Sequence, residues 1–168
     1  MNKNKNTTRM IVNVAIYAAL FIVFDLMQNN MGLLQMPNGG SLGISTVIIL
    51  LASYQLGYKT GLLVGLISVF LQFLTGPMYI VGILGFMLDY VIGFAVYGLA
   101  SLFKNYKYFY PGVLISNILR FISVSLSGVY VFGLDWIPSM AYNITYMLPT
   151  AIVGMILVPI LHERLKTK

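Results

Sequence analysis

Long uninterrupted apolar segments dominate this 168-residue sequence and constrain its fold more than any other feature. The hydrocarbon core of a bilayer is about 30 Å thick, so a helix that crosses it needs roughly 20 apolar residues. Charged residues make up 8% of the chain, whereas a soluble domain carries roughly 25% because its surface faces water. Both faces of the long segments are apolar, unlike the alternating strands of an outer-membrane barrel. The sequence therefore predicts an all-α integral membrane protein.

Breaks in hydropathy divide the chain into six predicted transmembrane helices within a single domain over residues 1–168. Asn, Gly and Pro mark several breaks, as in the loop Asn29–Gly40 and at Gly76-Pro77. No small-residue cleavage site closes the first apolar run, so we expect a retained helix rather than a signal peptide. The predicted helices cover about 10–28, 42–57, 60–75, 80–103, 112–132 and 139–161.

The distribution of positive charge predicts the orientation. In a six-helix topology nine of the ten Lys and Arg residues fall on one side, and the other side carries only Asp135. Cytoplasmic loops carry the excess of Lys and Arg in membrane proteins, so we expect a cell-membrane protein with both termini in the cytoplasm. A five-helix topology would scatter these charges over both sides. The nine residues are Lys3, Lys5, Arg9, Lys59, Lys104, Lys107, Arg164, Lys166 and Lys168.

Three ionisable residues, Asp25, Asp89 and Arg120, fall within the predicted helices. A charge at the centre of a bilayer costs roughly 2.5–3.5 kcal/mol, so such residues are usually paired and often functional. Asp89 and Arg120 differ in predicted depth by only about 5 Å. We expect them to form an ion pair, which either fixes the helix register or belongs to a site. Asp25 lies near the outer end of its helix, where we expect a solvated carboxylate.

Small, amide and aromatic residues suggest three further features. Ala15 and Ala19 lie four residues apart on the first helix, a spacing that permits close approach of another helix, either from this chain or from a second protein. Asn143 lies about one turn inside the last helix, where its amide needs a partner. Aromatic residues near the outer ends of the last two helices form an interfacial belt or line a site. They are Tyr130, Phe132, Trp136, Tyr142 and Tyr146.

The sequence carries no signature of catalysis or of metal binding. It has no cysteine, its only histidine is His162 in the basic tail, and it lacks a P-loop, a nucleophile elbow and a metal-ligand cluster. We therefore expect no enzyme activity, no cofactor and no metal. Two alternatives stay open: a small membrane enzyme or assembly factor that uses Asp89 and Arg120, and a proton-coupled carrier that uses Asp25 and Asp89.

Several segments together, by their order and spacing, resemble the thiamine-specific substrate-binding (S) subunits of energy-coupling factor transporters. The resemblance covers about residues 10–160. Each motif is short, and only the combination is specific. The segments are Met36–Ser41 in the first outer loop, Leu88–Tyr90 with Gly98–Ala100, and Arg120–Phe121, Ser127–Gly128, Tyr142–Asn143 and Tyr146–Pro149 in the last two helices.

The resemblance implies the six-helix S-component fold, which binds thiamine at its outer side and docks on a module of one transmembrane subunit and two ATPases. It also implies that Ala15 and Ala19 face that transmembrane subunit. A buried carboxylate suits the aminopyrimidine and the cationic thiazolium of thiamine, and aromatic faces can stack on both rings. The residues predicted to bind substrate are Asp89, Tyr90, Phe132, Tyr142, Asn143 and Tyr146.

The sequence departs from the family pattern at two positions of the predicted site, whereas a third position, Phe132, keeps the aromatic residue. Val124 stands where the family has His, and Pro138 stands where a Tyr is expected five residues before Asn143. Phe132 occupies a position where some members have Trp. A related compound, such as a pyrimidine or thiazole precursor, is therefore an open alternative to thiamine.

Overall fold

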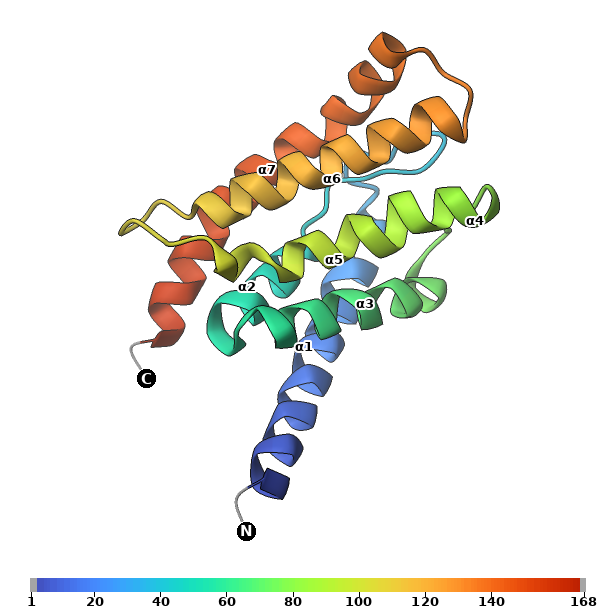
Figure 1. Ribbon diagram of the computed structural model, residues 1–168. Coiled ribbons are helices and arrows are strands. Elements are labelled where there is room, and N and C mark those ends of the chain that lie inside the picture. Colours follow the sequence, from blue (N-terminus) through green and yellow to red (C-terminus); the bar gives the residue numbers. More distant parts are fainter. Residues whose placement is uncertain (1–2, 167–168) are drawn as a thin grey trace.

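The chain folds into helices connected by loops, as predicted (Figure 1). The computed structural model describes residues 3–166, with side chains from residue 7 onward. Within this part the only β-type pairing is an isolated bridge between Tyr106 and Phe109. The elements are α1 (Lys3–Met31), α2 (Thr46–Leu56), α3 (Tyr58–Thr75), α4 (Gly82–Gly85), the π-helix η1 (Phe86–Ile92), α5 (Gly93–Gly98), the 3₁₀ turn η2 (Ala100–Leu102), α6 (Pro111–Tyr130) and α7 (Trp136–Lys166).

Five helical stretches in the described residues are long and apolar enough to cross a membrane. They are α1, α3, α6, α7 and the stretch Gly82–Leu102, which contains α4, η1, α5 and η2. With 11 residues α2 is only about 16 Å long, so the predicted helix over about 42–57 is wrong in its extent. The chain before α2 packs as a loop instead, because the Gly43 amide donates to Oγ1 of Thr150 on α7 (2.9 Å).

Glycines bring α3 and α5 into backbone contact. A Cβ added at Gly98 would lie 2.4 Å from the nitrogen of Leu62, and one added at Gly65 would lie 2.8 Å from the oxygen of Phe94. The hydroxyl of Ser53 on α2 donates to the Gly98 oxygen (2.6 Å). Small residues permit such close approach between helices that face lipid. These contacts fix α5 against α2 and α3.

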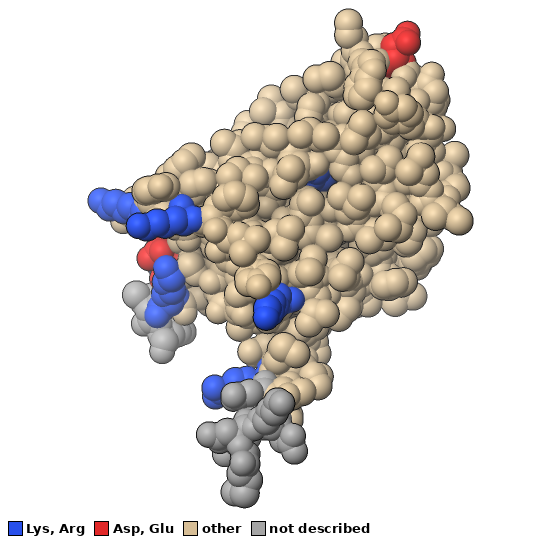
Figure 2. Space-filling model, viewed as in Figure 1, with Lys and Arg blue, Asp and Glu red and all other residues tan. Residues whose placement is uncertain are grey.

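Both ends of the described chain lie at the same end of the bundle, and the N-terminal part of α1 extends beyond the other helices (Figure 1). Basic side chains gather at this end, whereas an acidic side chain marks the opposite end (Figure 2). The side chains of Lys3 and Lys5, and the whole of Lys168, lie outside the described residues. Apart from Arg120, which borders the cavity, the described basic side chains thus gather at one end of the bundle.

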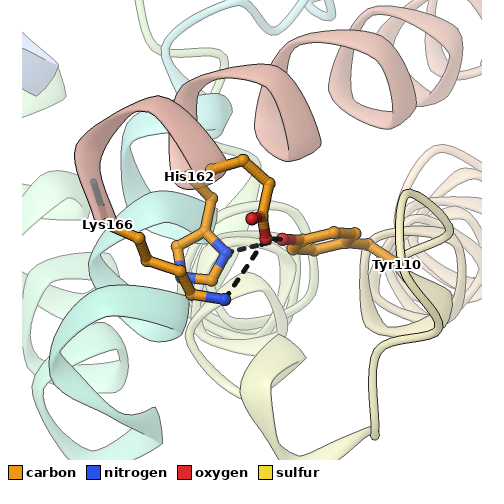
Figure 3. A network of polar contacts seen from close by, with 4 residues as sticks. Tyr110, His162 and Lys166 are labelled. Carbon is orange, nitrogen blue, oxygen red and sulfur yellow. Dashed lines mark hydrogen bonds and ion pairs between the residues drawn. The ribbon is translucent and has the colours of Figure 1, made fainter.

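A polar network holds the end of α7 against the start of α6 (Figure 3). The Tyr110 hydroxyl donates to Oε1 of Glu163 (2.9 Å) and lies 2.7 Å from Nδ1 of His162. Lys166 Nζ lies 3.2 Å from the same Glu163 oxygen. Burial raises the pKa of the Tyr110 phenol above its ordinary value, and the hydrogen bond to Glu163 adds to this effect. His162 is buried, so it is a structural residue and not a free side chain of the basic tail.

The contact between α3 and α5 leads to a stability prediction. Gly98→Ala places a methyl group within 2.5 Å of backbone atoms of Gly61 and Leu62, which can yield only if the helices separate. We expect the free energy of unfolding to fall by about 1–3 kcal/mol, measured by thermal unfolding in detergent. Gly154→Ala on α7 is the matched control, because the nearest atoms, at 3.2 Å and beyond, belong to side chains. Equal effects of both substitutions would contradict the prediction.

Candidate functional site

A cavity of about 250 Å³ lies within the bundle at the end away from the termini. Its wall contains residues from the C-terminal part of α1, from η1 and α5, from the second half of α6 and from the first turns of α7. The loops 32–45 and 76–81, here named the covering loops, contribute most of the other wall residues. The rest are Thr46 of α2, Gln72 of α3, and Phe132 and Leu134 between α6 and α7. A single water needs only about 10–15 Å³, so the cavity has room for a small organic molecule.

The structure brings all six predicted substrate-binding residues to this cavity. Arg120 and Val124 border it as well, whereas Pro138 is exposed at the start of α7 and is not part of the wall. Their contact with a ligand stays a prediction. The six residues are Asp89, Tyr90, Phe132, Tyr142, Asn143 and Tyr146.

Asp89 is the carboxylate with open hydrogen-bonding capacity. It lies on η1, and π-helical turns of this kind occur frequently at functional sites. Its Oδ2 accepts one hydrogen bond, from the Ser127 hydroxyl (2.8 Å), and no other donor among the described residues reaches it. An ionised carboxylate offers about four acceptor positions. Most of the acceptor capacity of Asp89 is therefore available to a ligand.

Arg120 does not form the expected ion pair with Asp89, although both border the cavity and both lie in the described part of the chain. Its guanidinium instead lies over the ring of Phe94, at 4.3 Å from the centroid, and near the ring of Tyr97, at 5.5 Å. These aromatic faces stabilise the cation without a carboxylate contact. Its Nε is buried and has no hydrogen-bond partner. The predicted structural ion pair is thus wrong as a direct contact.

Asn143 is buried and already bound by the protein. Its amide nitrogen donates to the backbone oxygens of Ser139 (2.9 Å) and Val124 (3.3 Å), and its Oδ1 accepts from the Tyr146 hydroxyl (2.7 Å). An amide has two donor protons and two acceptor positions. In this arrangement Asn143 can offer a ligand one acceptor position on Oδ1 and no proton.

The first covering loop is held against the helices by tyrosines. The Tyr142 hydroxyl accepts from the Asn38 amide (3.0 Å) and donates to the Gly39 oxygen (2.9 Å). Gly40 has φ +94°, which favours glycine, and a Cβ added there would lie 2.6 Å from the Tyr146 ring. In the second covering loop the Tyr79 amide donates to the Tyr90 hydroxyl (2.9 Å). Predicted substrate-binding tyrosines therefore also fasten the loops that close the cavity.

Asp25 lies in the cavity wall, and its predicted exposure to solvent was wrong. It was expected at a solvated helix end, but it is 3% exposed and borders the cavity together with Gln28 and Asn29. The sequence signal is the spacing: three polar residues at i, i+3 and i+4 share one face of an otherwise apolar helix. The cavity wall thus extends beyond the six predicted residues to α1 and to residues of α2 and α3.

An apolar helical bundle with a cavity lined by carboxylate, amide and aromatic groups defines a class, the membrane proteins that bind a small organic molecule. Among the described residues no cluster of His, Cys, Asp or Glu is suited to hold a metal ion. Over residues 11–168 the chain matches the thiamine transporter protein family, and it belongs to that family. The predicted family is therefore confirmed, and with it a role in transport rather than catalysis.

Two relatives agree with this assignment. The thiamine transporter ThiT of Bacillus subtilis (strain 168) is 30% identical in an alignment 182 positions long, which covers 96% of this chain and 93% of that protein. A structure titled as ThiT from Listeria monocytogenes superposes with a TM-score of 0.78 at 18% identity, over 96% of this chain and 97% of that chain. At this level of identity the structural match shows a shared fold.

The contact between Gly40 and Tyr146 predicts that the first covering loop tolerates no side chain there. In Gly40→Ala the methyl group collides with the ring, so we expect faster hydrogen exchange in residues 36–42, measured by mass spectrometry. Gly32→Ala is the matched control, because Gly32 also has a left-handed φ (+62°) but no atom within 4 Å of an added Cβ. Its effect should be limited to backbone strain of about 1–2 kcal/mol. The same exchange in both variants would reject the role of this contact.

Proposed function

We propose that this chain binds thiamine in the cavity at the outer end of the bundle and delivers it to an energy-coupling factor module for ATP-driven uptake. The observation that carries this proposal is Asp89, a half-buried carboxylate with open acceptor positions in a cavity with aromatic walls. Family membership supports it, because the family is named for thiamine transport.

The chemistry of the cavity suits thiamine. The aminopyrimidine offers an amino group that can donate to Asp89, and a charge-assisted bond of this kind is stronger than a neutral one. The cationic thiazolium is attracted to the aromatic faces of Tyr90 and Phe132. The wall contains two carboxylates, Asp25 and Asp89, and one cation, Arg120, so its net charge favours a cationic ligand.

The proposed orientation has six membrane-crossing segments with both termini in the cytoplasm. It is supported by the shared end of the two termini and by the basic side chains that gather there (Figures 1 and 2). In this arrangement the cavity and its covering loops lie toward the outside. Because α2 is short, its segment spans the membrane together with the loop that precedes it, within the protein interior, where irregular backbone is tolerated.

Docking on the transmembrane subunit of the module is proposed for the Ala15–Ala19 face of α1. Both alanines are exposed, so they do not pack against other helices of this chain. Neighbouring apolar side chains of α1, among them Ile16 and Val23, are also more than half exposed. A small-residue spacing on an exposed apolar face supports close approach of a partner helix.

Asp89→Asn tests the ligand site. The substitution keeps the shape of the side chain but replaces one oxygen of the carboxylate, and its charge, with an NH2 donor. We therefore expect thiamine affinity to fall about ten- to a hundredfold, measured by isothermal titration calorimetry. Asp135→Asn is the control, because Asp135 is exposed and outside the cavity wall. Unchanged affinity in Asp89→Asn would leave Asp89 without a direct role. Wild-type protein that binds a pyrimidine or thiazole precursor but not thiamine would keep the family and change the ligand.

Ala15→Trp and Ala19→Trp test the docking face. The indole rings should prevent close approach of the partner helix, so we expect loss of co-purification with the transmembrane subunit while thiamine binding persists. Ile156→Trp, at an exposed apolar position on α7 and outside the proposed docking face, is the control. If both alanine variants still assemble and support thiamine uptake, this face does not dock the module.

A further inference from the structure

Asp25, near the outer end of α1, is surrounded by hydrogen-bond donors. Its Oδ1 accepts from Gln28 Nε2 (2.8 Å) and from the Ser45 hydroxyl (3.0 Å). Its Oδ2 accepts from Asn29 Nδ2 (3.3 Å) and from the Thr75 hydroxyl. None of these donors is a cation. A carboxylate that is 3% exposed thus obtains its stabilisation from neutral donors alone.

The orientations of the two amide donors are fixed by second contacts. Gln28 Oε1 accepts from the backbone amide of Ser45 (3.0 Å), so its nitrogen must face Asp25. Asn29 Nδ2 also donates to the backbone oxygen of Thr75 (3.1 Å). Four donors fill the roughly four acceptor positions of a carboxylate. Asp25 therefore has no capacity left for a ligand, although it borders the cavity, and in this it differs from Asp89.

The donors to Asp25 lie at the bases of both covering loops. Ser45 is the last residue of the loop 32–45, directly before α2, and Thr75 is the last residue of α3, directly before the loop 76–81. Gly76 follows at a point where an added Cβ would lie 2.5 Å from Asn29 Nδ2. One carboxylate on α1 thus joins the two chain segments from which the covering loops depart.

The middle of each covering loop is held from the other side of the cavity. Tyr142 on α7 binds the backbone of Asn38 and Gly39, and Tyr90 on η1 binds the backbone of Tyr79. The two loops also meet, because a Cβ added at Gly39 would lie 3.0 Å from the Tyr79 ring. Each loop is therefore fastened at its middle by a tyrosine and at its base by Asp25.

We propose that Asp25 is a positioning residue: by holding the bases of both covering loops it keeps the cavity closed and sets the rate at which a bound molecule leaves, without contacting that molecule. The identity of the molecule, thiamine, rests on the proposed function. The hold of Asp25 on the loops consists of contacts within the protein, so it can be tested without a ligand.

Asp25→Asn tests this proposal with two measurements. The variant keeps the size of the side chain but places an amide nitrogen against two of the four donors. In the ligand-free protein, hydrogen exchange should become faster in both covering loops. In kinetic binding experiments the dissociation rate of thiamine should rise about tenfold or more, with a much smaller change in the association rate. Asp89→Asn is the comparison, because it should weaken binding and leave loop exchange unchanged.

Two variants probe the loops one at a time and do not depend on the folding of Asp25→Asn. Ser45→Ala should accelerate exchange in residues 32–45, and Thr75→Val should accelerate it in residues 76–81. The Ser45 side chain makes no capping bond to α2, so its removal leaves the helix start intact. Acceleration confined to the matching loop supports the proposal.

Two results would overturn it. Unchanged loop exchange in the Ser45 and Thr75 variants would show that the carboxylate does not hold the loops. Weaker thiamine binding in Asp25→Asn with unchanged loop exchange would show that Asp25 acts on the ligand directly. A wild-type protein that does not bind thiamine would reject the proposed function alone, because the exchange experiments need no ligand.

Discussion

The site depends on one constraint, that a polar group inside a lipid-facing bundle must be hydrogen-bonded by the protein itself or by a ligand. An unsatisfied buried group costs about 1–3 kcal/mol, and more when it is charged. Asn143 and Asp25 meet the constraint with protein donors and acceptors. Asp89 meets it only in part, through Ser127. The cavity thus contains one carboxylate whose hydrogen bonding a bound molecule can complete.

The remaining helices position this incomplete group. Glycine contacts set α5 directly against α3, and the Ser53 hydroxyl joins α2 to the same point. On the other side, a Cβ added at Gly128 would lie 2.0 Å from the Ser139 hydroxyl, so α6 and α7 also approach closely. The π-helix η1, which carries Asp89, continues directly into α5 and also contacts α6, so both packed pairs fix its position. Backbone contacts of this kind leave little freedom for the wall of the cavity to shift.

Much of the molecule could be predicted from its sequence, because lipid imposes strong length and composition rules. The apolar segments predicted the helices. The resemblance to the family, which rests on the order and spacing of short motifs, predicted six residues that the structure places in the wall of one cavity. The short length of α2 was missed, since loop residues 42–45 are as apolar as a helix end but pack as part of the cavity wall. The predicted ion pair of Asp89 and Arg120 was wrong because the depth of a residue along its helix does not determine the direction in which its side chain points. Aromatic faces of Phe94 and Tyr97 compete for the cation.

The π-helical segment Phe86–Ile92 has a consequence for how this chain tolerates length changes. A π-helical turn accommodates one more residue than an α-helical turn, and such turns occur as single-turn bulges within α-helices. Removal of one residue here would restore regular α-helical geometry and improve the local hydrogen bonds. The residues on either side of the segment would keep their register, because the wide turn absorbs the extra residue. The side chains inside the segment, Asp89 among them, would shift around the helix axis by a fraction of one residue's rotation of about 100°. The number of residues in this segment therefore helps to set the direction of Asp89, and a deletion that makes the helix more regular would redirect this carboxylate while the neighbouring turns keep their places in the wall.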